Sequence, residues 1–200
     1  MPNVKLSAAE LALACNADIL LTKNTIIEKV YDLFGRLSAS YIDILKAEDA
    51  FRNFNSPSAK ISKGENYRGL PWVMLDYPRV FSDEQIFSVR TMFWWGHHFS
   101  QFLILKGTPL PESTLIPDLI QKGTIGPSYL CIAGDPWQHH FEADNMIPAN
   151  SLTNSQITDQ VNRSGFLKLG TKIPIDRWES VENIMSPGFK NLLDIAAAGM

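Results

Sequence analysis

The residues best able to do chemistry in this sequence are its four histidines, which form two adjacent pairs, His97-His98 and His139-His140. Two acids, Glu142 and Asp144, follow the second pair. In a helix, His140 and Asp144 would lie one turn apart on one face. In a strand, His140, Glu142 and Asp144 would share a face. Either conformation therefore gives a histidine a carboxylate neighbour.

A mononuclear metal site is the sharper hypothesis for these residues. His140 with Glu142 or Asp144 would supply the local ligands, and His97 or His98 would complete a site of two histidines and one carboxylate. Zinc or non-haem iron would fit, with a position left open for water or substrate. The competing interpretation is a polar bend at His97-His98 and a modest surface ion pair at His140. It carries more weight, because the spacing matches no established metal signature.

A second candidate site combines arginines with large aromatic side chains. Arg68, Arg79 and Arg90 could bind a carboxylate or phosphate, since a guanidinium group binds such groups through two parallel hydrogen bonds. Trp72 and Trp95 would supply aromatic walls. In the structural alternative, which is favoured, the aromatics form core and the arginines pair with nearby acids at the surface. At strand spacing, Trp94 and Trp95 must face opposite sides of a sheet.

Familiar catalytic motifs do not occur in the sequence. It has no dinucleotide-binding fingerprint, no phosphate-binding loop with its lysine, no Cys-x-x-Cys, no His-Glu-x-x-His and no Gly-x-Ser-x-Gly. Catalytic residues are therefore not assigned, and whether the protein is an enzyme stays open.

The N-terminal part is predicted to be a helical hairpin. Ser7 to Glu10 forms a capping box for a short helix that ends near Cys15 or Leu21. A second capping box, Thr25 to Glu28, would open a long amphipathic helix. Its apolar stripe consists of Val30, Phe34, Leu37, Tyr41, Ile44 and Phe51. We expect the stripe to pack on a sheet or a partner helix, and homodimerisation through this helix is the alternative.

The central part is predicted to be a mainly antiparallel β-sheet. A polar loop is expected over 53–66, followed by strands rich in aromatic and β-branched residues up to position 105. Gly96-His97-His98 would form the bend between two of them, and one helix over 84–105 is the competing interpretation. Residues 107–127, with Pro and Gly, predict a long loop with at most one helical turn. A short strand is expected over 129–133.

The C-terminal part is predicted to be mixed. Asp135-Pro136-Trp137-Gln138 has the pattern of a helix start, and this helix would end before Pro148. A short helix with Ile157 and Val161 would end at Gly165, and a strand would follow over 166–173. Capped helices are expected to begin at Asp176 and at Ser186-Pro187.

Bulk properties are those of an ordinary globular chain. It has 200 residues, 45% hydrophobic and 20% charged, with a net charge of −3. That charge argues against a non-specific nucleic-acid binder. No segment has the length of a membrane span or the pattern of a signal peptide. The two distant cysteines, Cys15 and Cys131, are expected to be free thiols, which favours a cytoplasmic location.

These patterns predict one α+β domain over 1–200, helical over 1–55, mainly β over 67–133 and mixed over 135–200. The predicted function is binding of a small molecule between the aromatic strands and the helix at Asp135, in a pocket rimmed by the histidines. A metal ion could take part. The alternative is a non-catalytic scaffold protein that dimerises through the long N-terminal helix.

Overall fold

The computed structural model describes residues 4–107, 109–122 and 128–200. Its centre is a curved antiparallel sheet of seven strands, in the order β1-β2-β3-β4-β7-β5-β6. The strands are β1 (Lys60–Tyr67), β2 (Leu70–Phe81), β3 (Ile86–Trp94), β4 (His98–Lys106), β5 (Tyr129–Cys131), β6 (Met146–Pro148) and β7 (Leu167–Pro174). The predicted α+β class, with a central antiparallel sheet, is confirmed.

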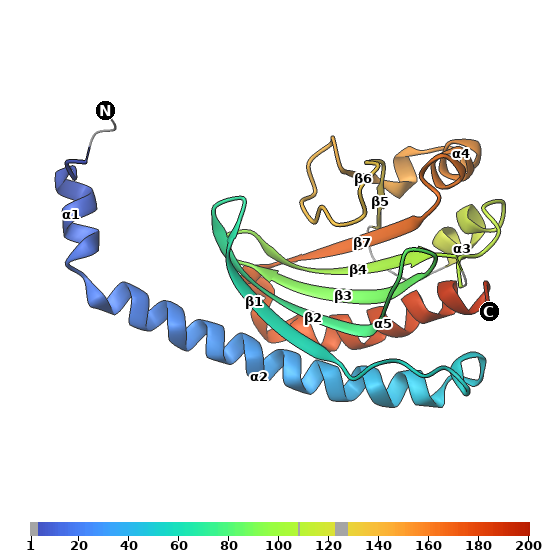
Figure 1. Cartoon of the computed structure of the whole chain (residues 1–200), viewed down its shortest axis with the longest axis horizontal. Helices are drawn as coiled ribbons and strands as arrows, with labels where there is room; N and C mark the ends of the chain where they lie inside the picture. Colours follow the sequence, from blue (N-terminus) through green and yellow to red (C-terminus); the bar gives the residue numbers. More distant parts are fainter. Residues whose placement is uncertain (1–3, 108, 123–127) are drawn as a thin grey trace.

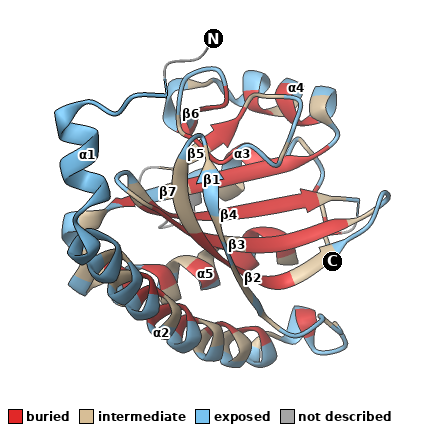
Figure 2. Cartoon of the chain, turned by 60° about the vertical axis from the view of Figure 1, so that its left-hand side comes forward, coloured by how far each residue is buried: buried red, intermediate tan, exposed pale blue. Residues whose placement is uncertain are grey.

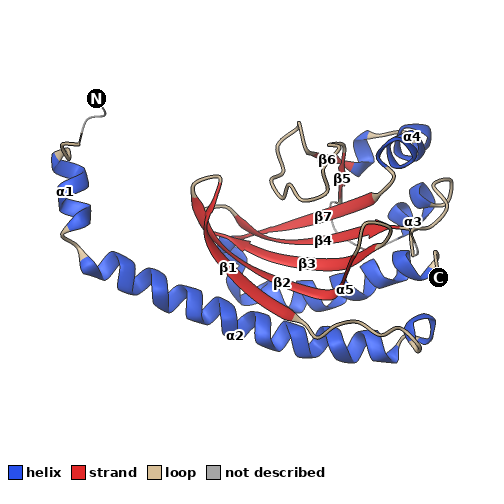
Figure 3. Ribbon diagram, in the orientation of Figure 1, coloured by secondary structure: helices blue, strands red, loops and turns tan. Residues whose placement is uncertain are grey.

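Helices cover one face of this sheet, as Figures 1 and 3 show. The α-helices are α1 (Ala8–Ala14), α2 (Ala17–Ala47), α3 (Ile116–Lys122), α4 (Asn154–Ser164) and α5 (Val181–Ala197). Short 3-10 helices also occur at η1 (Asp49–Phe51), η2 (Ala149–Ser151) and η3 (Ile175–Ser180). The long helices α2 and α5 pack against each other and against the sheet.

Strand alternation divides the sheet into two chemically different faces. On β3, Phe87, Val89 and Phe93 point to the helices and belong to the main core. The intervening side chains of β3, such as Ser88, Arg90 and Met92, point to the opposite face. We call this opposite side of β1–β4 and β7 the polar face. It also carries Asp76, Ser100 and Lys168, all of them buried.

Tight turns set the register of the meander. Arg68 and Gly69 both have positive φ, at 51° and 86°, and join β1 to β2. This is the backbone that a two-residue hairpin turn demands. Gly96, with φ 74°, lies in the turn between β3 and β4. The two strands and bend predicted around Gly96 are therefore confirmed, and the alternative helix over 84–105 is wrong.

The long helix begins earlier than predicted and does not form a hairpin with α1. Asn16 caps it, its side chain accepting from the backbone N–H of Asp18. Thr25 lies inside the helix, where its hydroxyl donates to the carbonyl oxygen of Leu21. Helix α1 has no buried residue, and Figure 2 shows it and the first turns of α2 as an exposed arm. From Ile27 onward the apolar stripe packs into the core.

Several other predicted elements are corrected. The predicted loop over 53–66 contains most of β1, because this polar segment pairs as an edge strand with β2. Helix α3 spans seven residues rather than at most one turn, while positions 108 and 123–127 of that predicted loop lie outside the described residues. Helix α5 continues through Pro187 instead of starting there, since residues on both sides of the proline pack into the core.

The helix expected to begin at Asp176 is also corrected: residues Ile175–Ser180 form the 3-10 helix η3, and α5 begins at Val181 without a side-chain cap. Other predictions in this half are confirmed. Strands form at 129–131 and 167–174, and α4 ends at Gly165 in the left-handed conformation, φ 69°. Cys15 and Cys131 are free. None of the helices in the described part of the chain is both long enough and apolar enough to cross a bilayer.

Candidate functional site

The polar face holds a pocket of about 540 Å³ between the first three strands and the segment that follows β5. Trp72, Met74 and Tyr67 line one side, and Phe81 and Trp137 lie at the other. Its charged lining residues are Lys60, Asp76, Arg79 and Arg90. This volume is in the range of ordinary small-molecule sites. The sequence predicted a pocket between the aromatic strands and a helix at Asp135, rimmed by His97, His98, His139 and His140. Of these four histidines, His139 alone is among the residues that line this pocket.

An ion pair forms the floor of this pocket. Arg90 donates from Nε and Nη2 to the two oxygens of Asp76, at 2.7 and 3.0 Å. Its remaining group, Nη1, lies 2.8 Å from Nε2 of His139. Trp137 covers the guanidinium, with its ring centroid 5.2 Å from Cζ. Each nitrogen of the Arg90 guanidinium therefore has a partner. Arg90 forms part of the pocket floor and is not free to bind an anion.

His139 must be neutral in this arrangement. A guanidinium group can only donate, so Nε2 of His139 accepts from Arg90 and the ring proton resides on Nδ1. Burial, together with the nearby cations Lys168 and Arg90, holds the pKa of His139 well below its usual value. The backbone N–H of His139 donates to the hydroxyl oxygen of Tyr67 at 2.6 Å, which fixes the ring's position.

Lys168 lies beneath His139 and is only 1% exposed. Its Nζ donates to the carbonyl oxygens of Pro136 and Gln138 and lies 3.2 Å from Nδ1 of His139. No carboxylate in the described residues forms a salt bridge with it. Burial lowers the pKa of Lys168 to about 7. A neutral amine accepts the Nδ1 proton of His139, so the hydrogen-bond geometry and the low pKa agree.

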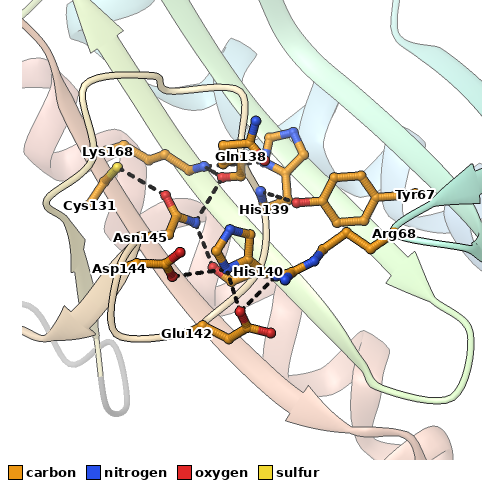
Figure 4. Close-up of polar contacts among 10 residues, drawn as sticks. All are labelled: Tyr67, Arg68, Cys131, Gln138, His139, His140, Glu142, Asp144, Asn145 and Lys168. Atoms are coloured by element: carbon orange, nitrogen blue, oxygen red, sulfur yellow. Dashed lines mark hydrogen bonds and ion pairs between the residues drawn. The ribbon is translucent and has the colours of Figure 1, made fainter.

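These same contacts explain why the predicted helix at Asp135 does not form. The side chain of Asp135 does accept from the backbone N–H of Trp137 at 2.9 Å, as a cap would. However, the carbonyls of Pro136 and Gln138 are taken by Lys168, and the N–H of His139 is taken by Tyr67. Tertiary partners replace the helical hydrogen bonds, and the segment becomes a fixed loop (Figure 4).

Asn145 holds the other end of this loop, residues 132–145, which we call the His-rich loop. Its Nδ2 donates to the carbonyl oxygens of Gln138 and His140, at 3.2 and 2.6 Å. Its Oδ1 accepts from the thiol of Cys131 at 3.6 Å. Burial raises the pKa of that thiol, so Cys131 is a donor in this contact and not a reactive thiolate.

The loop brings three of the predicted metal ligands together. Nδ1 of His140 lies 3.8 Å from Oε2 of Glu142 and 3.7 Å from Oδ1 of Asp144. These atoms lie within 4.8 Å of one another, and among the described residues neither His97 nor His98 joins the group. Figure 4 shows both carboxylates directed toward the imidazole. The structure thus assembles one histidine with two acids, where the sequence predicted two histidines with one acid.

The other histidine pair lies on the same side of the sheet but in aromatic contacts. The ring of His97 stacks on Trp94, with centroids 3.6 Å apart. His98 contacts Phe141 edge-on at 5.1 Å. Burial, with a smaller effect of Lys172, lowers the pKa of His98 to about 4. His98 therefore contacts the His-rich loop, but among the described residues neither His97 nor His98 is placed as a ligand.

The predicted ligand-binding residues are divided by the structure. Trp72, Arg79 and Arg90 line the pocket on the polar face. Arg68 instead pairs with Glu142, with Nη1 2.9 Å from Oε2. Trp95 faces the helices and lines a different, apolar pocket with Phe93 and Trp178. This agrees with the expectation that Trp94 and Trp95 face opposite sides.

Several residues of the site were not identified from the sequence, among them Lys60 of the pocket lining and Lys168, Tyr67 and Asn145 around the His-rich loop. Lys168 carried one signal, because a lysine between Leu167 and Leu169 in a strand interrupts an apolar run on a sheet buried on both faces. Tyr67 and Asn145 carried none, since their roles depend on backbone groups far away in the sequence.

Comparison of the chain with protein-family models, with curated proteins and with solved structures finds no match.

Proposed function

We propose that the protein binds a small anionic molecule with an aromatic or other planar group in the pocket on the polar face. The supporting observation is that two cations without ion-pair partners in the described chain, Lys60 and Arg79, line the pocket beside aromatic side chains. The Arg90–Asp76 pair at its floor has no net charge. Arg79 uses Nε to donate to the carbonyl oxygen of Ser58 at 2.7 Å. Its Nη groups, and Nζ of Lys60, have no polar partner among the residues that the structure describes.

The charges of the pocket favour an anion. Arg90 and Asp76 cancel each other, which leaves Lys60 and Arg79 as a local positive excess. A carboxylate or phosphate would accept from the Nη groups of Arg79, and a planar group would lie against Trp72 or Trp137. Because the floor is fixed by Asp76 and His139, binding would need little reorganisation of the protein. A cytoplasmic location, consistent with the free thiols, completes this proposal.

Calorimetric titration with benzoate and phenyl phosphate, and with the uncharged benzamide, tests the proposal. We expect the anions to bind at least tenfold more tightly than the amide. Arg79→Gln should weaken anion binding by about tenfold or more, because a hydrogen bond to a charged group contributes about 1.5–3 kcal/mol. Lys60→Gln should weaken it less, since Lys60 is more exposed and screened.

Lys29→Gln is the matched control, because Lys29 lines the apolar pocket on the helical side of the sheet. It should leave anion affinity unchanged. Equal affinity for acids and amide, or an equal loss in Lys29→Gln and Arg79→Gln, would contradict anion binding at this pocket.

The alternative function, a scaffold that dimerises through the long helix, has less support. The apolar stripe from Ile27 to Leu45 is buried in the chain's own core. In the described part of the chain, the arm before this stripe exposes Leu11, Leu13, Leu20 and Leu21, and a dimer contact through the helix would form there.

A further inference from the structure

The His-rich loop carries a second feature that the pocket does not use. The side chain of His140 is only 9% exposed, and its Nδ1 is a buried polar atom without a hydrogen-bond partner in the described chain. Buried polar atoms are nearly always satisfied, so such an atom asks for an explanation, and an ion is one of the ordinary ones. This nitrogen points between the carboxylates of Glu142 and Asp144 (Figure 4).

The distances between Nδ1 of His140 and the two carboxylates fit a shared metal ion better than direct hydrogen bonds. At 3.8 and 3.7 Å the oxygens of Glu142 and Asp144 are too far from Nδ1 for hydrogen bonds. Ligand atoms about 2.0–2.1 Å from one tetrahedral zinc ion would lie about 3.3 Å apart. The two distances to Nδ1 would each have to shorten by roughly half an ångström, and the carboxylates, whose ligand atoms lie within 4.8 Å of one another, would have to converge on the ion. Asp144 has that freedom, because its side chain is 76% exposed, whereas Glu142, 60% exposed, would move together with its partner Arg68.

The surroundings provide the support that a metal ligand needs. Asn145 fixes the backbone of His140 through its carbonyl oxygen at 2.6 Å, and the backbone N–H of Asn145 donates to the carbonyl oxygen of Glu142 at 2.9 Å. Arg68 holds Oε2 of Glu142 at 2.9 Å. Outer contacts of this kind orient the ligands of metal sites. With Arg68 included, the three charged groups sum to −1, which still favours a dication.

We propose that His140, Glu142 and Asp144 form a surface site for a single divalent transition-metal ion, with water completing the coordination. One imidazole and two carboxylates are donors that suit Zn²⁺. Magnesium and calcium prefer oxygen ligands alone. The iron site of two histidines and one carboxylate is not the set assembled here, because His97 and His98 lie outside the group of described ligands. The site is independent of the anion pocket.

Calorimetric titration of the full-length, chelator-treated chain without a histidine tag tests this site. We expect one equivalent of Zn²⁺ to bind, at least tenfold more tightly than Mg²⁺. His140→Gln and Asp144→Asn should each weaken Zn²⁺ binding more than tenfold, since loss even of an outer partner costs about 10- to 100-fold. Asp144 is exposed, so its substitution tests the site even if the buried His140 variant fails to fold.

His97→Gln is the matched control, because His97 is an exposed histidine of the same face that joins no ligand group in the described chain. Its Zn²⁺ affinity should equal that of the unaltered protein. Addition of Co²⁺ gives a second readout: its visible absorption should appear with the unaltered protein and disappear with Asp144→Asn. Failure to bind one equivalent of Zn²⁺, or equal losses in the His97 and Asp144 variants, would overturn the proposal. Anion binding would be unaffected by either result.

Discussion

At the scale of single residues, the most informative feature is the hydrogen-bond count around His139. Arg90 can only donate to its Nε2, so Nδ1 holds the proton and Lys168 must accept it. An ammonium group cannot accept, and the amine of Lys168 is therefore neutral in the folded protein when this network is complete. The burial that lowers the pKa of Lys168 to about 7 acts in the same direction.

Stability should consequently rise with pH in a window set by Lys168. Its pKa is about 7 in the folded state and about 10.4 when unfolded, so the unfolded chain binds more protons between these values. The free energy of unfolding should increase from pH 7 to pH 9 by up to about 2 kcal/mol relative to Lys168→Met. Urea unfolding of both proteins at the two pH values measures this. A difference that is independent of pH would show that Lys168 remains charged.

At the scale of elements, the His-rich loop is the part that depends most on a single side chain. Asn145 is 1% exposed and satisfies two loop carbonyls and the Cys131 thiol. Asn145→Ala should destabilise the protein by about 1–3 kcal/mol, because it leaves buried carbonyls without partners. Ser151→Ala, which removes an exposed hydroxyl contact elsewhere, is the control and should cost less.

The same substitution links the loop to the metal proposal. Asn145 fixes the backbone of His140, so Asn145→Ala should also weaken Zn²⁺ binding. Calorimetric titration without urea, on folded Asn145→Ala protein, measures this. A stable Asn145→Ala protein with unchanged Zn²⁺ affinity would argue that the loop is held by other contacts.

The elements also show where sequence patterns succeed and where they fail. Strands β3 and β4 were predictable because their alternation is local, and Gly96 marked the turn. The helix expected at Asp135 failed although its cap is present, because Lys168 lies 32 residues from Pro136 in sequence and takes its carbonyl. For the site, the local group of His140, Glu142 and Asp144 was predictable from spacing. Which distant residues would join it was not.

At the scale of the whole molecule, the sheet divides two kinds of burial. The helical side is apolar and follows the periodicity of α2 and α5. On the polar side of the sheet, Asp76, His139 and Lys168 are buried and Arg90 is largely covered, at a cost in desolvation that apolar residues would avoid. Burial lowers the pKa of both His139, which lines the pocket, and Lys168, which contacts His139, and such shifts are typical of functional sites. Both proposed sites, the anion pocket and the metal site, lie on the polar side of the sheet.

The exposed arm, which consists of α1 and the first turns of α2, lies outside both kinds of burial. Leu37 in the buried part of α2 is fully covered, whereas Leu20 and Leu21 in its first turns are 63% and 61% exposed. Leu37→Ala should lower the free energy of unfolding by about 2–5 kcal/mol, and Leu20→Ser with Leu21→Ser by no more than about 1 kcal/mol. Urea unfolding measures both. If the double substitution costs as much as Leu37→Ala, the arm must be buried in solution. Light scattering would then measure the molar mass of both proteins. A mass that halves in the double variant would show that a second copy of the chain covers the arm.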